Sequence, residues 1–226
     1  MKNVFISGST KGIGKAIAVE LASKNFNIFL HGRSNRDLRK LAKKIKKNNQ
    51  SNVKIISADF SKEKDLIKVC NFLKKNSVQI IINNAGQYIN GNIEETSLKD
   101  IKNLFQINFF SNFFIIKNFV KWKKDNFVII NINSFAGKNS SENEVAYAAT
   151  KHSLYSLSKS LKAEFIGKKV KIIDLFLSAV KTRITLNRKN YKELIDPKDI
   201  ASLIYDLLTK YSSLQASEVN IFKNKS

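Results

Sequence analysis

Short apolar runs alternate with longer amphipathic segments along the whole chain. The apolar runs have the length of β-strands and predict strands at 3–7, 27–31, 54–57, 78–82, 127–132, 170–176 and 218–222. The segments between them repeat apolar residues with a helical period and predict helices at 12–24, 36–48, 62–76, 98–120, 145–165 and 197–211. Asp196 before Pro197 favours a helix start at that point.

This alternation indicates a fold class. Strands that are apolar throughout need cover on both faces, and strands that alternate with helices run parallel. We therefore expect a doubly wound, Rossmann-type α/β fold with a parallel sheet of about seven strands and helices on both faces. The single proline and the scattered glycines leave no linker, so residues 1–226 are expected to form one domain. Ligands of such folds bind beyond the carboxyl ends of the strands.

Three of the 8 glycines, Gly8, Gly12 and Gly14, lie within seven residues directly after the first apolar run. A tight turn followed by a helix that opens at Gly12 would direct unpaired backbone N–H groups at an anion such as a dinucleotide pyrophosphate. Glycine suits both positions because a Cβ would block the turn and the approach of backbone to ligand. The spacing Gly-x-x-x-Gly-x-Gly is moderately specific, so a plain strand-to-helix turn is the alternative.

Polar residues also follow the later strands of the predicted sheet. Arg33 follows the second strand, Asp59 the third, Asn83 the fourth and Ser134 the fifth, and residues 178–182 follow the sixth. Because the carboxyl ends of parallel strands share one edge, we expect these residues to form one site.

Tyr147 and Lys151 are four residues apart, on one face of a predicted helix. A neighbouring ammonium favours the phenolate, so we expect a lowered pKa for Tyr147. Such a tyrosine can donate a proton to a carbonyl oxygen as hydride arrives. Ser134, 13 residues earlier, is placed to hold the same oxygen. Tyr-x-x-x-Lys also arises by chance in a lysine-rich chain, and the serine is what strengthens the interpretation.

With these residues the chain resembles the short-chain dehydrogenases/reductases of the compact, single-domain type over nearly its whole length. The motifs, in the family's order, are Ser-Gly-Ser-Thr-Lys-Gly-Ile-Gly at 7–14, Asp59-Phe60, Asn83-Asn84-Ala85-Gly86, Asn108, Ile132-Asn133-Ser134 and Tyr-Ala-Ala-Thr-Lys at 147–151. The stretch 147–164 is similar to 3-oxoacyl-[acyl-carrier-protein] reductases.

The resemblance implies roles for a catalytic set. Tyr147 would be the acid in reduction and the base in oxidation, and Lys151 would lower its pKa and bind the nicotinamide ribose. Ser134 would orient the substrate carbonyl, and Asn108 would support a water-mediated proton relay to Lys151. The implied cofactor-binding residues are Gly8, Ser9, Lys11, Gly12, Ile13, Gly14, Arg33, Asp59, Phe60, Asn83, Tyr147, Lys151, Val180 and Thr182. For Asn108 and Asn83, an ordinary helix or turn position in an Asn-rich chain is the alternative.

The cofactor prediction rests on charge. Members of this family that use NAD carry an acidic residue at the end of the second strand. Here 31–34 reads His-Gly-Arg-Ser, and Lys11 stands inside the glycine loop. Two cations would flank a 2′-phosphate, so NADP(H) is expected in preference to NAD(H). The alternative is that Lys11 and Arg33 are two more surface cations.

The chain departs from the family after the sixth strand, where Leu177-Ser178 replaces the usual Pro-Gly. Because of this replacement, the resemblance does not predict the backbone path from Ser178 to Thr182. The segment 183–196, expected to cover the substrate, is short and basic, and the chain stops soon after 222. A large, enclosed substrate pocket is therefore not expected.

The formal net charge of +22 has two interpretations. It is either a solvated surface in an Asn-, Ile- and Phe-rich chain, or it attracts an acidic partner such as nucleic acid, an anionic carrier protein or a phosphorylated cofactor. Few aromatic residues interleave with the lysines, which disfavours a nucleic-acid platform. The chain lacks an export signal and an apolar stretch of about 18 residues, so we expect a cytoplasmic protein that does not enter membranes.

The positions of cysteine, histidine and phenylalanine bear on metal binding and on assembly. Cys70 is expected to pack as a small apolar residue, and His31 and His152 lack partners at ligand spacing, so no metal site is predicted. Phenylalanines are frequent in 98–120, and the resemblance implies that this helix pairs with its copy in a homodimer or homotetramer.

The leading hypothesis is thus an NADP(H)-dependent reductase of a small or carrier-bound carbonyl substrate, with 3-oxoacyl thioesters as candidates. A catalytically silent NADP-binding sensor or scaffold and a nucleic-acid-binding protein are the rivals.

Overall fold

The computed structural model describes residues 1–48, 50–139, 142–211 and 214–224, which contain one sheet of seven parallel strands in the order β3-β2-β1-β4-β5-β6-β7. The strands are β1 (Asn3–Ile6), β2 (Asn27–Gly32), β3 (Val53–Ser57), β4 (Ile80–Asn83), β5 (Phe127–Ser134), β6 (Val170–Leu177) and β7 (Glu218–Ile221). The helices include α1 (Gly12–Ser23), α2 (Asn35–Asn48), α3 (Glu63–Lys75), α4 (Leu98–Phe105), α5 (Ser111–Trp122), α6 (Val145–Glu164) and α7 (Pro197–Thr209). The predicted Rossmann-type fold is confirmed.

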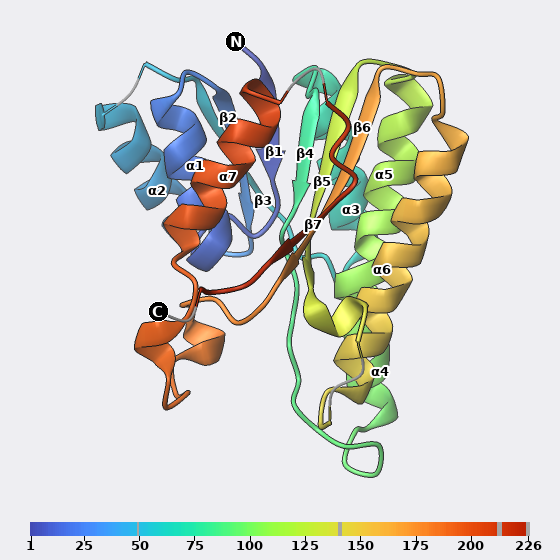
Figure 1. Ribbon diagram of the computed structural model, residues 1–226. Coiled ribbons are helices and arrows are strands. Elements are labelled where there is room, and N and C mark those ends of the chain that lie inside the picture. The colour runs from blue at the N-terminus through green and yellow to red at the C-terminus, as the bar shows by residue number, and fades with distance from the viewer. Residues whose placement is uncertain (49, 140–141, 212–213, 225–226) are drawn as a thin grey trace.

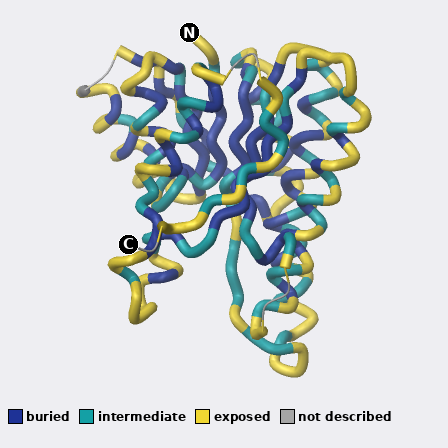
Figure 2. The backbone as a smooth tube through the Cα atoms, viewed as in Figure 1, coloured by how far each residue is buried: buried dark blue, intermediate teal, exposed yellow. Residues whose placement is uncertain are grey.

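The side chains of alternate strand residues point to opposite faces of the sheet and pack into two apolar layers, one on each face. In β1, Val4 and Ile6 pack into the layer covered by α1, α2 and α7, whereas Phe5 packs into the layer with α3, α5 and α6. Figure 1 shows the two groups of helices on opposite sides of the sheet, and Figure 2 shows the central strands as the most buried part of the chain. Cys70 packs beside the second layer, as expected, and burial raises the pKa of its thiol to about 11.

The predicted helix at 98–120 is interrupted by a π-helical turn, η1 (Gln106–Phe110), between α4 and α5. Ser111 Oγ and Asn112 Nδ2 donate to the carbonyl oxygens of Ile107 (2.7 Å) and Asn108 (2.8 Å), where the widened turn disturbs the regular helix bonds. Asn108 itself points out of the helix toward Gln87. The apolar period could not predict this irregularity, because side-chain hydrogen bonds stabilise it.

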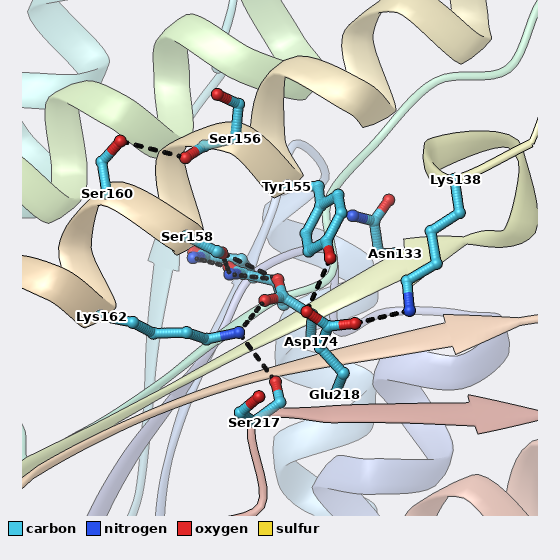
Figure 3. A network of polar contacts seen from close by, with 12 residues as sticks. Asn133, Lys138, Tyr155, Ser156, Ser158, Ser160, Lys162, Asp174, Ser217 and Glu218 are labelled. Carbon is cyan, nitrogen blue, oxygen red and sulfur yellow. Dashed lines mark hydrogen bonds and ion pairs between the residues drawn. The ribbon is translucent and has the colours of Figure 1, made fainter.

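A buried polar cluster joins α6 to the sheet. The Asp174 carboxylate on β6 is fully buried and accepts from Lys162 Nζ (2.8 Å), Ser158 Oγ (2.8 Å) and Asn131 Nδ2 (3.1 Å). Lys162 also donates to the carbonyl of Ser217, one residue before β7 (2.9 Å). Figure 3 shows Lys162 reaching both groups. Burial raises the pKa of Asp174, while Lys162 opposes the rise.

Two segments project beyond the carboxyl ends of the strands, the chain between β4 and α4 and the chain between β6 and α7 (Figure 1), and much of both is exposed (Figure 2). The second contains the 3₁₀ turns η3 (Arg183–Thr185) and η4 (Tyr191–Glu193). Its path after Leu177-Ser178 is fixed by pairing with Ile195, which accepts from Lys181 N (2.9 Å) and donates to Ala179 O (3.2 Å). Within the described ranges, no helix has the length and apolarity to cross a membrane.

Candidate active site

The glycine loop connects the ends of β1 and β4. Gly8 has a φ of +63°, and a Cβ on Gly14 would lie 2.5 Å from the carbonyl oxygen of Gly8, so a side chain at either position would displace the loop. Asn84 Nδ2 donates to the carbonyls of Ser7 (2.9 Å) and Gly8 (3.1 Å). Ser7 Oγ accepts from the backbone N–H groups of Asn84 and Ala85 (2.9 Å each). The loop is therefore held in place by the chain itself.

The start of α1 is suited to an anion. Lys11 is the N-cap, no side chain caps the helix, and none of the residues in its described first turn is acidic. The backbone N–H groups at such a start are free for a ligand. The methyl group of Thr182 lies 3.3 Å from the Cβ that Gly12 lacks. The segment after β6 thus meets the glycine loop, as the sequence predicted for one shared site.

His31 supports the glycine loop from β2. Its Nδ1 accepts from the backbone N–H of Gly8 (3.2 Å), its Nε2 contacts the carbonyl of Ala58 (3.1 Å), and its ring stacks on Phe60 at 4.1 Å. Burial lowers the pKa of His31 to about 4, so the ring is neutral and can accept the Gly8 hydrogen bond. Sequence reasoning missed this role. A histidine that ends an otherwise apolar strand was the available signal.

Four of the predicted cofactor-binding residues differ in accessibility. Lys11 and Arg33 are exposed, and Arg33 lies near Asp59, whose pKa is lowered chiefly by the backbone N–H of Ser61 and further by Arg33. The Asp59 carboxylate accepts from both the N–H and the hydroxyl of Ser61. The Asn83 side chain is buried and donates to Asn131 Oδ1 (2.8 Å), so it faces the protein interior.

Ser134, Tyr147 and Lys151 come together at the carboxyl end of β5. Ser134 ends the strand, and its side chain interacts with the phenol of Tyr147, which lies in the first turn of α6. Lys151 is buried one helical turn later, with Nζ 5.7 Å from the centre of the Tyr147 ring. Asn108 contacts this region through Thr150 Oγ1, to which its Nδ2 donates (3.1 Å).

The expected direction of the Tyr147 pKa is wrong for the chain as folded. Burial raises the pKa of Tyr147 to about 12, and Ser134 opposes the rise. The Lys151 ammonium instead donates to the carbonyl of Ile132 (3.0 Å), and burial lowers its own pKa to about 8. The spacing of Tyr147 and Lys151 predicted the shared helix face but neither the burial nor the backbone acceptor.

Tyr88 and Glu144 border the same phenol. The Tyr88 ring meets the Tyr147 ring edge to face at 5.0 Å, and its hydroxyl donates to Glu144 Oε1 (2.8 Å). Burial and then Glu144 raise the pKa of Tyr88 to about 12, while Arg188 opposes them. Arg188, from the segment between β6 and α7, therefore lies beside Tyr88. Sequence reasoning missed all three residues, and no motif marks them.

In the described part of the chain, His, Cys, Asp and Glu side chains form no group of three or more that could hold a metal ion. The site thus consists of a glycine loop, a serine and a tyrosine–lysine pair on a parallel sheet. A family model described as short chain dehydrogenase matches residues 2–193. The chain belongs to the short-chain dehydrogenase family.

Similar proteins cover 97% to 100% of this short-chain dehydrogenase. It is 24% identical over 226 residues to an uncharacterised oxidoreductase of Staphylococcus aureus strain MW2, covering 97% of this chain and 96% of that protein. An alcohol dehydrogenase of Thermococcus sibiricus, solved with 5-hydroxy-NADP, is 22% identical with a TM-score of 0.90, covering 100% of this chain and 99% of the other. A 3-oxoacyl-[acyl-carrier protein] reductase of Brucella melitensis is 20% identical with a TM-score of 0.87, covering 97% and 89%.

Proposed function

We propose that this short-chain dehydrogenase interconverts a carbonyl and an alcohol with NADP(H), with Tyr147 as the proton donor in reduction. The observation that carries the proposal is the buried Lys151 with its Nζ 5.7 Å from the centre of the Tyr147 ring, and Ser134 interacting with the same phenol. A reduced nicotinamide dinucleotide, when bound, supplies the hydride. The T. sibiricus alcohol dehydrogenase with 5-hydroxy-NADP and a metagenomic short-chain oxidoreductase with NADP (23% identical, TM-score 0.86, covering 100% of this chain and 98% of that one) support this class of reaction.

The pKa values favour reduction. With a pKa near 12, Tyr147 is protonated at neutral pH and holds the proton that a carbonyl oxygen takes up. Ser134 donates a hydrogen bond to the same oxygen and orients it. Lys151, with a pKa near 8, is cationic at pH 7 and stabilises the phenolate that proton transfer leaves behind. Asn108, which contacts Thr150, supports the return of a proton to this pair.

The residues present fit NADP(H). The crowded glycine loop has no room for Cβ atoms, and the uncapped start of α1 offers backbone N–H groups to a pyrophosphate. Neither residue 33 nor residue 34 is acidic, and Arg33 and Lys11 are exposed cations that would flank a 2′-phosphate. Asp59 and the backbone of Asn83 and Phe60 would border the adenosine, and Val180 and Thr182 the nicotinamide.

This cofactor preference is tested by Arg33→Glu. The ratio of kcat/KM with NADPH to that with NADH should fall by at least about tenfold, since a charge-assisted contact becomes a repulsion. Arg36→Glu is the control, because Arg36 is exposed on α2 and its sole ion pair within the described residues, with Asp37, is long (3.9 Å between Nε and Oδ1) and therefore weak. An unchanged ratio in Arg33→Glu would remove Arg33 from the cofactor site.

A 3-oxoacyl thioester is the first substrate to test. The stretch 147–164, the B. melitensis neighbour and a basic surface that suits an acidic carrier protein support it. Loss of NADPH absorbance on adding acetoacetyl thioesters would establish this substrate. If these thioesters are inert while small ketones are reduced, the reaction class stands and the thioester assignment falls.

We also propose a homodimer through α4, η1 and α5. Phe110 and Phe113 are 51% and 43% exposed, and both contact the Phe109 ring, at 5.3 and 6.1 Å between centroids. The core leaves this aromatic cluster uncovered, and a second copy of the helix across a two-fold axis would bury it.

A further inference from the structure

Ser134 is the N-cap of a short 3₁₀ turn, and the geometry of this turn fixes the position of the serine. The turn is η2 (Phe135–Gly137), and Ser134 Oγ accepts from the backbone N–H of Ala136 (3.2 Å). The backbone N–H of Ser134 donates to Asn133 Oδ1 (2.9 Å). Lys138 closes the turn by donating its N–H to the carbonyl of Phe135 (3.0 Å). Where the hydroxyl lies therefore depends on where the turn lies.

β7 and the residue that follows it contact both ends of this turn. The Phe135 ring packs on Phe222 at 4.1 Å, and Lys138 Nζ lies 2.6 Å from Glu218 Oε2 and 3.3 Å from Asn220 Oδ1. Glu218 and Asn220 share one face of β7, and Phe222 continues the same alternation one residue after the strand ends. In the sheet β7 pairs with β6 and not with β5, so these contacts reach over β6.

The Lys138–Glu218 pair differs from an ordinary surface ion pair. Both side chains are largely covered, at 22% and 30% exposure. Lys138 Nζ lies 4.2 Å from the centre of the Phe176 ring, and the second carboxylate oxygen of Glu218 accepts from Tyr155 Oη (2.6 Å). Figure 3 shows Tyr155 and Lys138 meeting Glu218 from two sides. Such a fixed, charge-assisted arrangement is stronger than an exposed pair.

The turn is also packed tightly against α6, which carries the tyrosine and the lysine. A Cβ on Gly137 would lie 2.8 Å from Asn133 Oδ1 and 3.2 Å from the carbonyl oxygen of Lys151. With no free space on that side, a displacement of Lys138 passes along the turn to Ser134.

We propose that Glu218, Lys138 and the Phe135–Phe222 stack are a positioning device for Ser134, by which the last strand sets the hydroxyl that contacts Tyr147. The proposal rests on the proposed function for the role of Ser134 in turnover. Lys138 and Glu218 are positioning residues, since they act through the turn. The last strand thereby contributes to the active site without reaching it.

The turnover test uses Lys138→Met and Glu218→Gln, with a carbonyl that the wild type reduces. Each variant should lower kcat by about tenfold, because small displacements of reacting groups are costly, and leave KM for NADPH unchanged. Lys159→Met is the control, since Lys159 is an exposed cation that touches the Tyr155 ring at 5.6 Å but not the turn. In a Ser134→Ala background, Lys138→Met should cause no further loss. Independent, multiplying losses, or a lower melting temperature with wild-type kcat, would overturn the proposal.

A second readout needs no substrate and separates this proposal from the proposed function. In protein labelled with [¹³Cζ]tyrosine, the Tyr147 resonance is identified by its absence in Tyr147→Phe. Ser134→Ala should shift it, Lys138→Met and Glu218→Gln should shift it in the same direction, and Lys159→Met should leave it in place. If the Tyr147 resonance has the same chemical shift in Lys138→Met and Glu218→Gln as in the wild type, the positioning role of Lys138 and Glu218 is refuted even if the enzyme proves active. Failure of every carbonyl to react would refute the proposed function alone.

Discussion

The buried His31 makes the stability of this protein depend on pH in a defined range. Its pKa is about 4 in the folded chain against 6.5 for a free side chain, because burial disfavours the charged ring. Below pH 6.5 the unfolded chain therefore binds a proton that the folded chain does not, and the free energy of unfolding falls as the pH falls. Between pH 7.5 and 4.5 this loss is roughly 2 to 3 kcal/mol.

The assay is urea unfolding of wild type and His31→Gln at pH 7.5, 6.0, 5.0 and 4.5. Glutamine does not titrate and retains an acceptor for the Gly8 N–H. The stability advantage of the wild type over the variant should shrink by roughly 2 to 3 kcal/mol from the highest to the lowest pH. If the two proteins lose stability in parallel, His31 is not held neutral by burial and the reasoning is wrong.

Three further predictions address the loop, the core and the assembly. Gly14→Ala should weaken NADPH binding by at least about tenfold in a fluorescence titration, because the new Cβ would lie 2.5 Å from Gly8 O; wild-type affinity would contradict the fit. Lys162→Met leaves the fully buried Asp174 carboxylate without its cation and should lower the free energy of unfolding by about 3 kcal/mol. Urea curves that overlay the wild type would argue against this buried pair. Phe110→Asp should convert a dimer to monomers in sedimentation velocity, and a persisting dimer would place the interface elsewhere.

The sequence pattern located the strands and helices because burial on both faces of a parallel sheet leaves a clear apolar signal. It ended β5 at 132, however, whereas the strand continues to Ser134. The polar side chain of Asn133 lies inside the protein, where its amide is 3.4 Å from the carbonyl of Lys151. A hydrophobic pattern cannot register a polar residue that is buried and paired by its tertiary neighbours.

The motifs placed Ser134, Tyr147 and Lys151 on neighbouring elements, but they did not predict where the side chains of these residues point. Lys151 bonds a backbone carbonyl, burial raises the pKa of Tyr147 against the expected direction, and Asn108 in the π-helical turn contacts Gln87 from a distant segment. The roles of the site residues, the preference for NADP(H), the oligomer and the cytoplasmic location stay predictions.

We propose that Tyr147 transfers the proton in an NADPH-dependent carbonyl reduction. The most direct measurement compares wild type and Tyr147→Phe for the loss of NADPH absorbance over a panel of acetoacetyl thioesters, small ketones and sugars, with NADPH binding followed by fluorescence. We predict turnover by the wild type and a loss of at least about a hundredfold in the variant, with NADPH binding retained. NADPH binding without turnover of any carbonyl by the wild type would favour a catalytically silent sensor or scaffold, and equal turnover by both proteins would remove Tyr147 as the acid.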